Sequence, residues 1–460
     1  MDTQTLQDCL ADLDRDLLQR DAAVRVLLLG ALAGEHVLLV GPPGTAKSEL
    51  ARRLQRVFAG ARYFERLLTR FSVPEELFGP LSLRALEDDR YERLTDGFLP
   101  TAQVAFLDEV FKANSAILNA LLTLLNEREF DNGSGRVAVP LISVVGATNE
   151  VPDDEALQAF YDRFALRVPV EPVADEQFVD LLQLPANLPQ PQARLDPRAL
   201  AGLRARATAV GLPPPVLALL VQARAFCAAQ QITVSDRRWR KLAALLQVQA
   251  ASRQPAGAPP AEVSPWDLWV LPFVLAARSS QVPVLRDGFL AGVGQAVPVD
   301  VQWLTRATEA FEKQLEIETS APASSDDEGA GKLALARAIA RPGAQDADQG
   351  LVRIVSDLAR KRYSALHVAA RAAQVQEVAD RAVAALKGVQ ATAEAVRVQA
   401  CAHLWLPPTW RDAIVAVHRD NVEVLARLLA RLHGVAEGFA TLPVDAALAA
   451  VEPSAVQILA

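Results

Sequence analysis

The stretch HVLLVGPPGTAKSELARRLQRVF, residues His36 to Phe58, decides the fold expected for this chain. Its first five residues form a short apolar run, which is typical of a buried strand. A loop rich in glycine and proline follows, and the amphipathic pattern from Ser48 to Phe58 predicts a helix. A strand, a glycine-rich loop and a helix in this order are the setting in which a phosphate-binding loop of pattern G-x-x-x-x-G-K-[ST] is credible. The position before the lysine holds Ala46, where that pattern has glycine.

The loop offers groups that suit a nucleotide and Mg²⁺. Backbone N–H groups around Gly41 and Gly44 would surround phosphate oxygens, with Gly44 at positive φ. Lys47 would reach the β- and γ-phosphates, and Ser48 would bind Mg²⁺. Because Ala46 opens the helix, where φ is negative and alanine is favoured, we expect it to be tolerated. The alternative is a turn that binds no nucleotide. The predicted ATP-binding residues are Gly41, Pro42, Pro43, Gly44, Thr45, Ala46, Lys47, Ser48 and Glu49.

Further strand and helix patterns surround this unit. Helical periodicity covers Gln4 to Leu32, and a helix is expected from Ser115 to Glu129. Apolar runs predict buried strands at Gln103–Asp108 and Leu141–Asn149. Continuous apolar strands separated by helices predict an α/β fold with a parallel sheet covered on both faces.

The rest of the chain reads as helical. We predict a nucleotide-binding core at 1–170, a small all-α lid at 171–285 and a mainly helical extension at 286–460. A polar, low-complexity segment near 319–350 predicts a flexible linker. Helical patterns from 350 to about 402 and from 410 to about 439 flank HLWLPPTW, which predicts a long antiparallel helical hairpin.

Carboxylates and an amide follow the two predicted strands. Asp108 and Glu109 end the first, where Asp108 would bind Mg²⁺ and Glu109 would polarise the attacking water as general base. An acidic pair facing solvent is the alternative. Asn149 ends the second strand, where it would orient the same water or would simply form a turn.

Arginines with directed, permanently charged donors suit a γ-phosphate. Arg163 in AFYDRFALR and Arg237 and Arg238 in VSDRRW are candidates, although any single arginine could equally be a solvated surface residue.

Composition limits the function classes. The net charge of −8 argues against a dedicated nucleic-acid coat protein. No apolar run reaches the ~18 to 20 residues of a membrane helix, and no signal peptide is evident. Three widely spaced cysteines, Cys9, Cys227 and Cys401, match no metal or disulfide spacing, and a cytoplasmic protein with reduced thiols is expected. Near Cys401, His403 is better explained by a helix end packed on a turn than by metal binding, and Trp405 and Trp410 by anchoring of the hairpin.

The chain resembles the MoxR family of AAA+ ATPases, especially its RavA (regulatory ATPase variant A) branch. The resemblance rests on GEHVLLVGPPGTAKS, ELFGPLSLRALEDDRYERLTDGFLP, FLDEVFKANSAILNALLTLLNERE, ATNE, YDRF and VSDRRW, an ordered set spanning about residues 1 to 285. Alanine before the lysine resembles the family's own form of the loop. The resemblance implies an AAA+ αβα core with a P-loop and a helical lid.

The resemblance also implies residue roles and an assembly. Lys47 and Ser48 match Walker A, and Asp108 and Glu109 match Walker B. Asn149 matches sensor 1. Arg163 matches the arginine finger, which acts on the neighbouring subunit's nucleotide, and Arg237 matches sensor 2, with Arg238 as the alternative. It further implies a hexameric ring that uses Mg²⁺ and ATP to remodel or activate another protein, together with a partner containing a von Willebrand factor A domain.

Two insertions match the family as well. Residues 80–98 look like a hairpin inserted in a helix, and residues 129–140, with the turn DNGSG, look like the hairpin before sensor 1. Ordinary surface hairpins are the alternative. The β-rich module that RavA-branch members can carry is expected to be missing or vestigial, because the interval from about 319 to 350 is short.

Two other function classes remain possible from the sequence. A nucleic-acid-dependent AAA+ motor would show ATPase stimulation by DNA or RNA that weakens with salt. A nucleotide-switched scaffold would keep its function when hydrolysis is abolished. A small-molecule kinase is a weaker option, since it needs neither the Walker B glutamate nor an arginine from a neighbour.

Overall fold

The computed structural model describes residues 2–133, 135–152, 154–185, 192–254, 261–293, 301–321 and 361–458. The chain forms two compact units: Met1–Gly294 with Gln399–Ile414, and Gln295–Val398 with Val415–Ala460. Each unit is described by itself below. The expected linker near 319–350 lies almost entirely outside the described residues.

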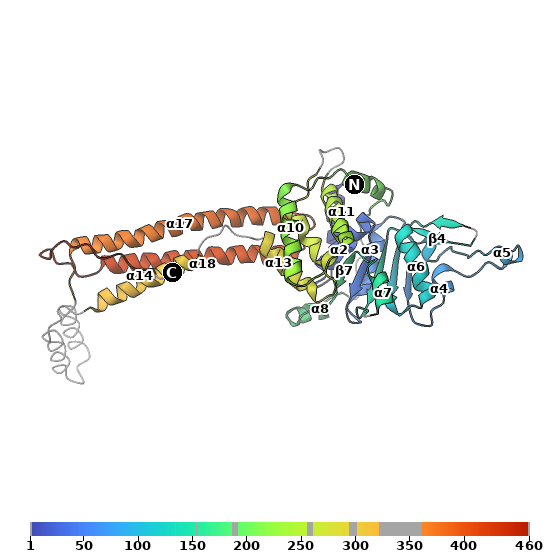
Figure 1. Ribbon diagram of the computed structural model, residues 1–460, viewed down its shortest axis with the longest axis horizontal. Helices are drawn as coiled ribbons and strands as arrows, with labels where there is room; N and C mark the ends of the chain where they lie inside the picture. The colour runs from blue at the N-terminus through green and yellow to red at the C-terminus, as the bar shows by residue number, and fades with distance from the viewer. Residues whose placement is uncertain are drawn as a thin grey trace, which may run out of the picture. The chain divides into compact units, whose positions relative to one another are not determined.

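The first unit is built on a five-stranded parallel sheet of order β2-β3-β6-β1-β7 (Figure 1). Its strands are β1 (Val37–Val40), β2 (Tyr63–Leu67), β3 (Val104–Asp108), β6 (Ser143–Thr148) and β7 (Leu166–Pro169). The expected α/β class with a parallel sheet is therefore confirmed. Sequence reasoning predicted β1, β3 and β6 and missed the short strands β2 and β7.

Helices cover both faces of this sheet. Those of the core are α1 (Thr3–Asp14), α2 (Asp21–Ala33), α3 (Lys47–Val57), α4 (Pro74–Phe78), α5 (Leu83–Glu87), α6 (Ser115–Glu127) and α7 (Glu155–Tyr161). The single helical pattern expected from Gln4 to Leu32 is in fact two helices, because Asp16 and Gln19 have positive φ of 56° and 55° and interrupt it.

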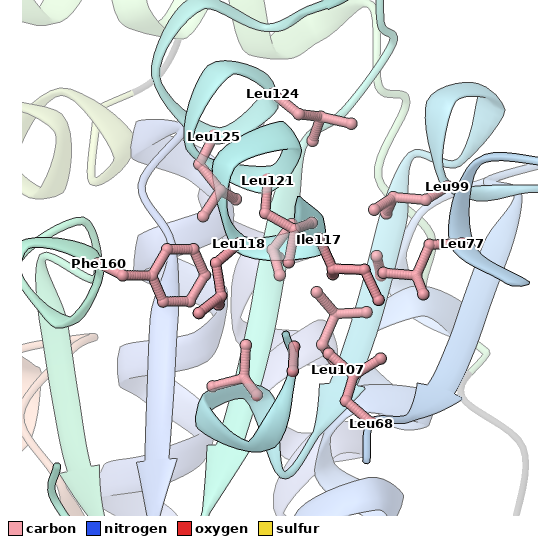
Figure 2. Close-up of a cluster of buried hydrophobic side chains, with 14 of the residues drawn as sticks. Leu68, Leu77, Leu99, Leu107, Ile117, Leu118, Leu121, Leu124, Leu125 and Phe160 are labelled. Carbon is pink, nitrogen blue, oxygen red and sulfur yellow. The ribbon is translucent and has the colours of Figure 1, made fainter. Parts of the chain in front are cut away.

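Side chains of α6 fill one face of the sheet. Leu107 of β3 packs with Ile117 and Leu121 of α6 in a cluster of buried residues that also includes Leu38 and Phe160 (Figure 2). Because successive residues of a strand point to opposite faces, Val37 and Leu39 of β1 face the other side. That side is covered by α2 and α3, which contact the sheet strands.

The remaining elements of this unit are helical. They are α8 (Phe178–Leu182), α9 (Ala199–Ala207), α10 (Pro214–Ala229), α11 (Asp236–Ser252), the 3₁₀ helix η4 (Pro265–Val270), α12 (Leu271–Leu275) and α13 (Gln281–Val293). These helices agree with the all-α lid expected after the core. No helix in the described ranges combines the length and apolar composition that crossing a membrane requires.

The segment between the two long C-terminal helices belongs to the first unit. Trp405 is fully buried, and its indole nitrogen donates to Ser252 Oγ over 2.9 Å. Trp410 stacks on Phe273, with ring centroids 5.6 Å apart. His403 donates to the buried carboxylate of Asp267 over 2.9 Å. Trp405 and Trp410 therefore anchor this segment within the first unit, as expected.

The second unit is a helical bundle. It contains α14 (Val301–Ser320) and most of α17 (Ala365–Ala402) and α18 (Pro408–Ala440). Apolar side chains from all three helices, including Phe311, Val375 and Leu432, form one buried cluster. The predicted helix between 350 and 402 is confirmed from Ala365 onward. Residues 361–364 are not helical, so the prediction is wrong there, and residues 350–360 lie outside the described part of the chain.

The two predicted insertions differ from each other. Residues 129–140 form the antiparallel hairpin of β4 (Glu129–Asp131) and β5 (Arg136–Ala138), as expected. Residues 80–98 were predicted to be a hairpin, which is wrong: the segment contains α5 and only an isolated bridge between Leu81 and Arg93. The apolar and charged residues of LRALE repeat at helical spacing, which favours a short helix over strands.

Candidate functional site

Strand order brings the predicted site residues to one edge of the sheet. β1, β6 and β3 are neighbours, and they run parallel. Their carboxyl ends therefore lie side by side and carry the glycine-rich loop, Asn149 and the pair Asp108–Glu109. Ligands of open α/β sheets bind at this edge.

The first glycine of the loop has a structural reason. A Cβ at Gly41 would lie 2.0 Å from the carbonyl oxygen of Val170, so no larger residue fits there. The Gly41 N–H donates to Thr148 O over 3.0 Å. The Gly41 N–H is therefore bound to the end of β6 and is not available to a phosphate.

The rest of the loop keeps its donors available. Gly44 has φ of +82°, as expected, and a Cβ there would have no atom within 4 Å. Within the described residues, the N–H groups of Gly44, Thr45 and Ala46 donate to no acceptor. They stand at the N-terminus of α3, where the helix dipole favours an anion. These residues fit a phosphate group.

Ala46 adopts an unexpected conformation. Its φ is +69° and its ψ 22°, in the left-handed region. The expectation of a negative φ was wrong, because the residue caps α3 and does not open it. The loop therefore needs the glycine-like conformation that the usual motif supplies, and alanine adopts it at a cost of roughly 1–2 kcal/mol.

Lys47 folds over the loop. Its Nζ donates to the carbonyl oxygens of Gly41 and Pro42, each over 2.8 Å, and the residue is buried. Burial lowers the pKa of Lys47, while the nearby carboxylates of Asp108 and Glu109 act to raise it. Lys47 therefore lies close enough to Asp108 and Glu109 to interact with them electrostatically.

The other loop residues are less constrained. Thr45 is buried, and its hydroxyl donates to Pro42 O over 2.9 Å. Pro42 and Pro43 are exposed, and Ser48 is half-buried at the first turn of α3. Glu49 accepts from Arg53 Nε over 3.1 Å, which directs it along its own helix.

Two acids and an amide meet beside the loop. Glu109 has φ of 53°, and its Oε1 accepts from Asn149 Nδ2 over 2.5 Å. Lys112 Nζ lies 3.2 Å from the same oxygen. Asp108 Oδ1 accepts from the backbone N–H of Glu109 over 3.0 Å. Adjacent strands thus bring the amide of Asn149 directly onto the carboxylate of Glu109.

The predicted arginines occupy two kinds of environment. Arg163 is half-buried in the turn after α7, and within the described residues its Nε has no hydrogen-bond partner. Arg237 is exposed on the first turn of α11, and in the described part of the chain its side chain makes no hydrogen bond or ion pair. Arg238 is buried and donates to Val274 O and to Asp162 Oδ1. Arg238 is therefore held in the protein, whereas Arg237 is available to a ligand.

Sequence reasoning missed one residue at the loop. Arg20 is buried just before α2, and its guanidinium donates to the carbonyl oxygens of Thr45 and Glu171. Burial lowers its pKa. These contacts hold the backbone at Thr45 and Glu171 in place. No local pattern near Arg20 predicts them, because Glu171 is 151 positions away in the sequence.

Comparisons with known proteins match two parts of this chain to family models. A model of the "MoxR domain in the MoxR-vWA-beta-propeller ternary systems" matches residues 4–200. A model of the AAA lid domain matches residues 215–289. The AAA+ fold expected from the sequence is therefore confirmed.

Individual proteins are similar to parts of this chain. An uncharacterised protein of Methanocaldococcus jannaschii is 42% identical over 51% of this chain and 62% of its own length. Chaperone MoxR1 of Mycobacterium tuberculosis is 28% identical over 42% of this chain and 51% of its own length. A crystal structure of an ATPase candidate from Cytophaga hutchinsonii has a TM-score of 0.48 and 16% identity, covering 60% of this chain and 87% of that one. The chain thus spans about half to three fifths of the length of these two curated relatives.

Proposed function

We propose that this chain hydrolyses ATP with the help of Mg²⁺. The observation that carries this proposal is the contact of Asn149 with Glu109, 2.5 Å long, at the sheet edge that also holds Lys47. A module that only held nucleotide would not require an amide directed at a carboxylate there. This pairing gives a general base a fixed orientation.

Each residue has a role that its position supports. The N–H groups of Gly44 to Ala46 and the ammonium of Lys47 would hold the β- and γ-phosphates. Ser48 and Asp108 have the hard oxygen ligands that Mg²⁺ prefers, and the bound ion would offset charge on the phosphate oxygens. Glu109 would take the proton of the attacking water, and Asn149 would keep its carboxylate in place.

We further propose that Arg163 completes the site of a neighbouring subunit in a hexameric ring. Its guanidinium is not used inside its own subunit in the described ranges, and a finger of this kind supplies about 10³- to 10⁵-fold in rate. Arg237, exposed on the lid, would contact the nucleotide of its own subunit, as sensor 2.

The partners are proposed from the family. The matching model describes MoxR domains that work with a von Willebrand factor A protein and a β-propeller protein, and we propose that this chain acts on a client in such a system. Chaperone MoxR1 is named for the same kind of activity. The likeness to the RavA branch remains part of the proposal, resting on the quoted motifs.

Substitution of the base tests hydrolysis. Glu109→Gln should bind ATP as tightly as the wild type, because the loop is untouched, and should lose at least about 10²-fold in turnover. Lys47→Ala should instead lose binding. Lys112→Ala is the matched control, since Lys112 also contacts Glu109 and is largely exposed. Wild-type turnover in Glu109→Gln would refute the assignment.

The same variant tests remodelling. Loaded with ATP, Glu109→Gln should retain a client or a von Willebrand factor A partner in a pull-down, and Lys47→Ala should not. If both variants retain the same proteins in equal amounts, a nucleotide-driven remodelling function is wrong.

A further inference from the structure

The loop that carries Arg163 is bonded to the lid of its own subunit. On the side preceding Arg163, the Tyr161 hydroxyl donates to Ala277 O over 2.8 Å. On the side following it, Arg167 Nη1 donates to Ala276 O over 3.2 Å. Ala276 and Ala277 directly follow α12 of the lid. The proposed finger is therefore attached to the lid on both sides.

Asp162, directly beside Arg163, links core and lid. Its Oδ1 accepts from Arg167 Nη2 over 2.7 Å and from Arg238 Nη2 over 3.3 Å. Arg167 belongs to β7 of the core, whereas Arg238 belongs to α11 of the lid and also donates to Val274 O. One carboxylate thus binds a core arginine and a lid arginine.

The two arginines are buried, whereas the Asp162 carboxylate that they share is 63% exposed. Their side chains are only 5% and 10% exposed, and burial lowers the pKa of Arg238 while Asp162 acts to raise it. The Arg167 guanidinium also lies over the Tyr161 ring, 3.6 Å from its centroid. Removing the shared carboxylate would leave both buried cations without their common partner.

The lid end of this connection lies beside Arg237. Arg237 and Arg238 are consecutive in the first turn of α11, one exposed and one tied to Asp162. If α11 moves in response to the nucleotide bound to its own subunit, Arg238 would transmit this movement to the loop that carries Arg163.

We propose that Asp162 is a positioning residue that couples the lid of one subunit to the arginine that this subunit offers to the next. The inference rests on the proposed function, since it requires Arg163 to act across a subunit boundary. Its consequence is that nucleotide state in one subunit controls hydrolysis in its neighbour.

Kinetics of Asp162→Ala give the first test. We expect kcat to fall at least about 10-fold, because the finger is misplaced, with KM and nucleotide affinity unchanged, because the variant's own loop is intact. Arg238→Gln should produce the same pattern from the lid side and replaces Asp162→Ala if that variant fails to fold. Asp175→Ala removes an exposed carboxylate without a partner in the described residues and should behave as wild type.

Mixed rings separate this inference from the proposed function. Glu109→Gln subunits bind ATP, so that their lid and finger are in the nucleotide-bound state, but they lose turnover. In a 1:1 mixture with Asp162→Ala they should restore about a quarter of the wild-type rate, since half of the subunits have a competent site and half of those receive an intact finger. Arg163→Ala, mixed in the same way, should recover equally.

The outcomes are distinguishable. If Arg163→Ala recovers and Asp162→Ala does not, Asp162 acts on its own site and the inference is wrong, whereas the proposed function stands. If neither recovers, the finger across the boundary and the inference are both refuted.

Discussion

At the scale of the residue, Ala46 stores backbone strain inside the phosphate-binding loop. Its φ of +69° costs an alanine roughly 1–2 kcal/mol, whereas glycine adopts it freely. Ala46→Gly should therefore raise the free energy of unfolding by up to about 1 kcal/mol, after the larger chain entropy of glycine is subtracted. The midpoint of urea unfolding measures this change.

Gly44→Ala is the complementary control, because it introduces the kind of backbone strain that Ala46→Gly removes. Its φ is +82° and a Cβ there would meet no atom within 4 Å, so the substitution adds backbone strain without a steric clash. We expect a loss of about 1 kcal/mol. If both substitutions leave the midpoint unchanged, the loop conformation described for Ala46 is wrong.

At the scale of the element, His36 joins β1 to two neighbouring elements. Its Nδ1 accepts from the N–H of Val144 in β6, and its Nε2 donates to Leu125 O in α6, each over 3.0 Å. The bond from Val144 requires the neutral ring, because a protonated Nδ1 cannot accept. Burial, reinforced by Arg128 and Lys241, lowers the pKa of His36 to about 3.

This depressed pKa predicts a pH dependence of stability. Between pH 6.5, the ordinary value for histidine, and about 3, the unfolded chain binds a proton at His36 that the folded chain does not. The contribution of neutral His36 to the free energy of unfolding is therefore fully present above pH 6.5. It falls by up to about 1.4 kcal/mol for each pH unit below that value. In urea unfolding, His36→Gln should be less stable at pH 7, and its difference from wild type should shrink toward pH 4. A constant difference would contradict this account.

A second buried network fixes the segment between the two long helices to the lid. Asp267 is fully buried and accepts from His403, Gln249 and Arg253. Although burial acts to raise the pKa of Asp267, its contacts with His403 and Arg253 hold it below the usual range.

His403→Ala leaves that carboxylate short of a donor. We expect a loss of about 1–3 kcal/mol in the free energy of unfolding, measured by urea titration. Cys401→Ala, two positions away and exposed, should stay within about 0.5 kcal/mol of wild type. Equal effects of the two substitutions would show that the network does not anchor the segment.

The elements with strong local sequence patterns could be predicted from the sequence. The candidate site residues lie at the ends of these elements. β1, β3 and β6 are apolar runs that end in chemically distinct residues. β2 was missed because YFERL is an edge strand with exposed polar residues. β7 was missed because its sequence, LRVP, has Arg167 and Pro169 in place of a continuous apolar run. Neither strand carries a predicted site residue.

Contacts between distant residues could not be predicted. Asp162 and Arg238 are 76 positions apart, and Arg20 and Glu171 are 151 apart. Only the packing of the lid against the core brings them together, so the motif YDRF pointed to Arg163 and not to the carboxylate beside it. The conformation of Ala46 was mispredicted for a related reason: propensity favours alanine in helices, whereas the loop geometry decides φ.

At the scale of the whole molecule, the account requires assembly. The site on one subunit has a loop, a base and an amide, and the cation proposed to complete it belongs to the next subunit. A single subunit should therefore be a poor ATPase, even when its nucleotide affinity is normal.

The most direct measurement is the ATPase rate per subunit across a dilution series, with the assembly state determined by mass photometry at each concentration. The account predicts a rise of about 10³-fold or more as rings form, and a uniformly low rate for Arg163→Ala even when it assembles. Monomers that hydrolyse ATP at the full rate, or Arg163→Ala rings as active as wild type, would contradict it.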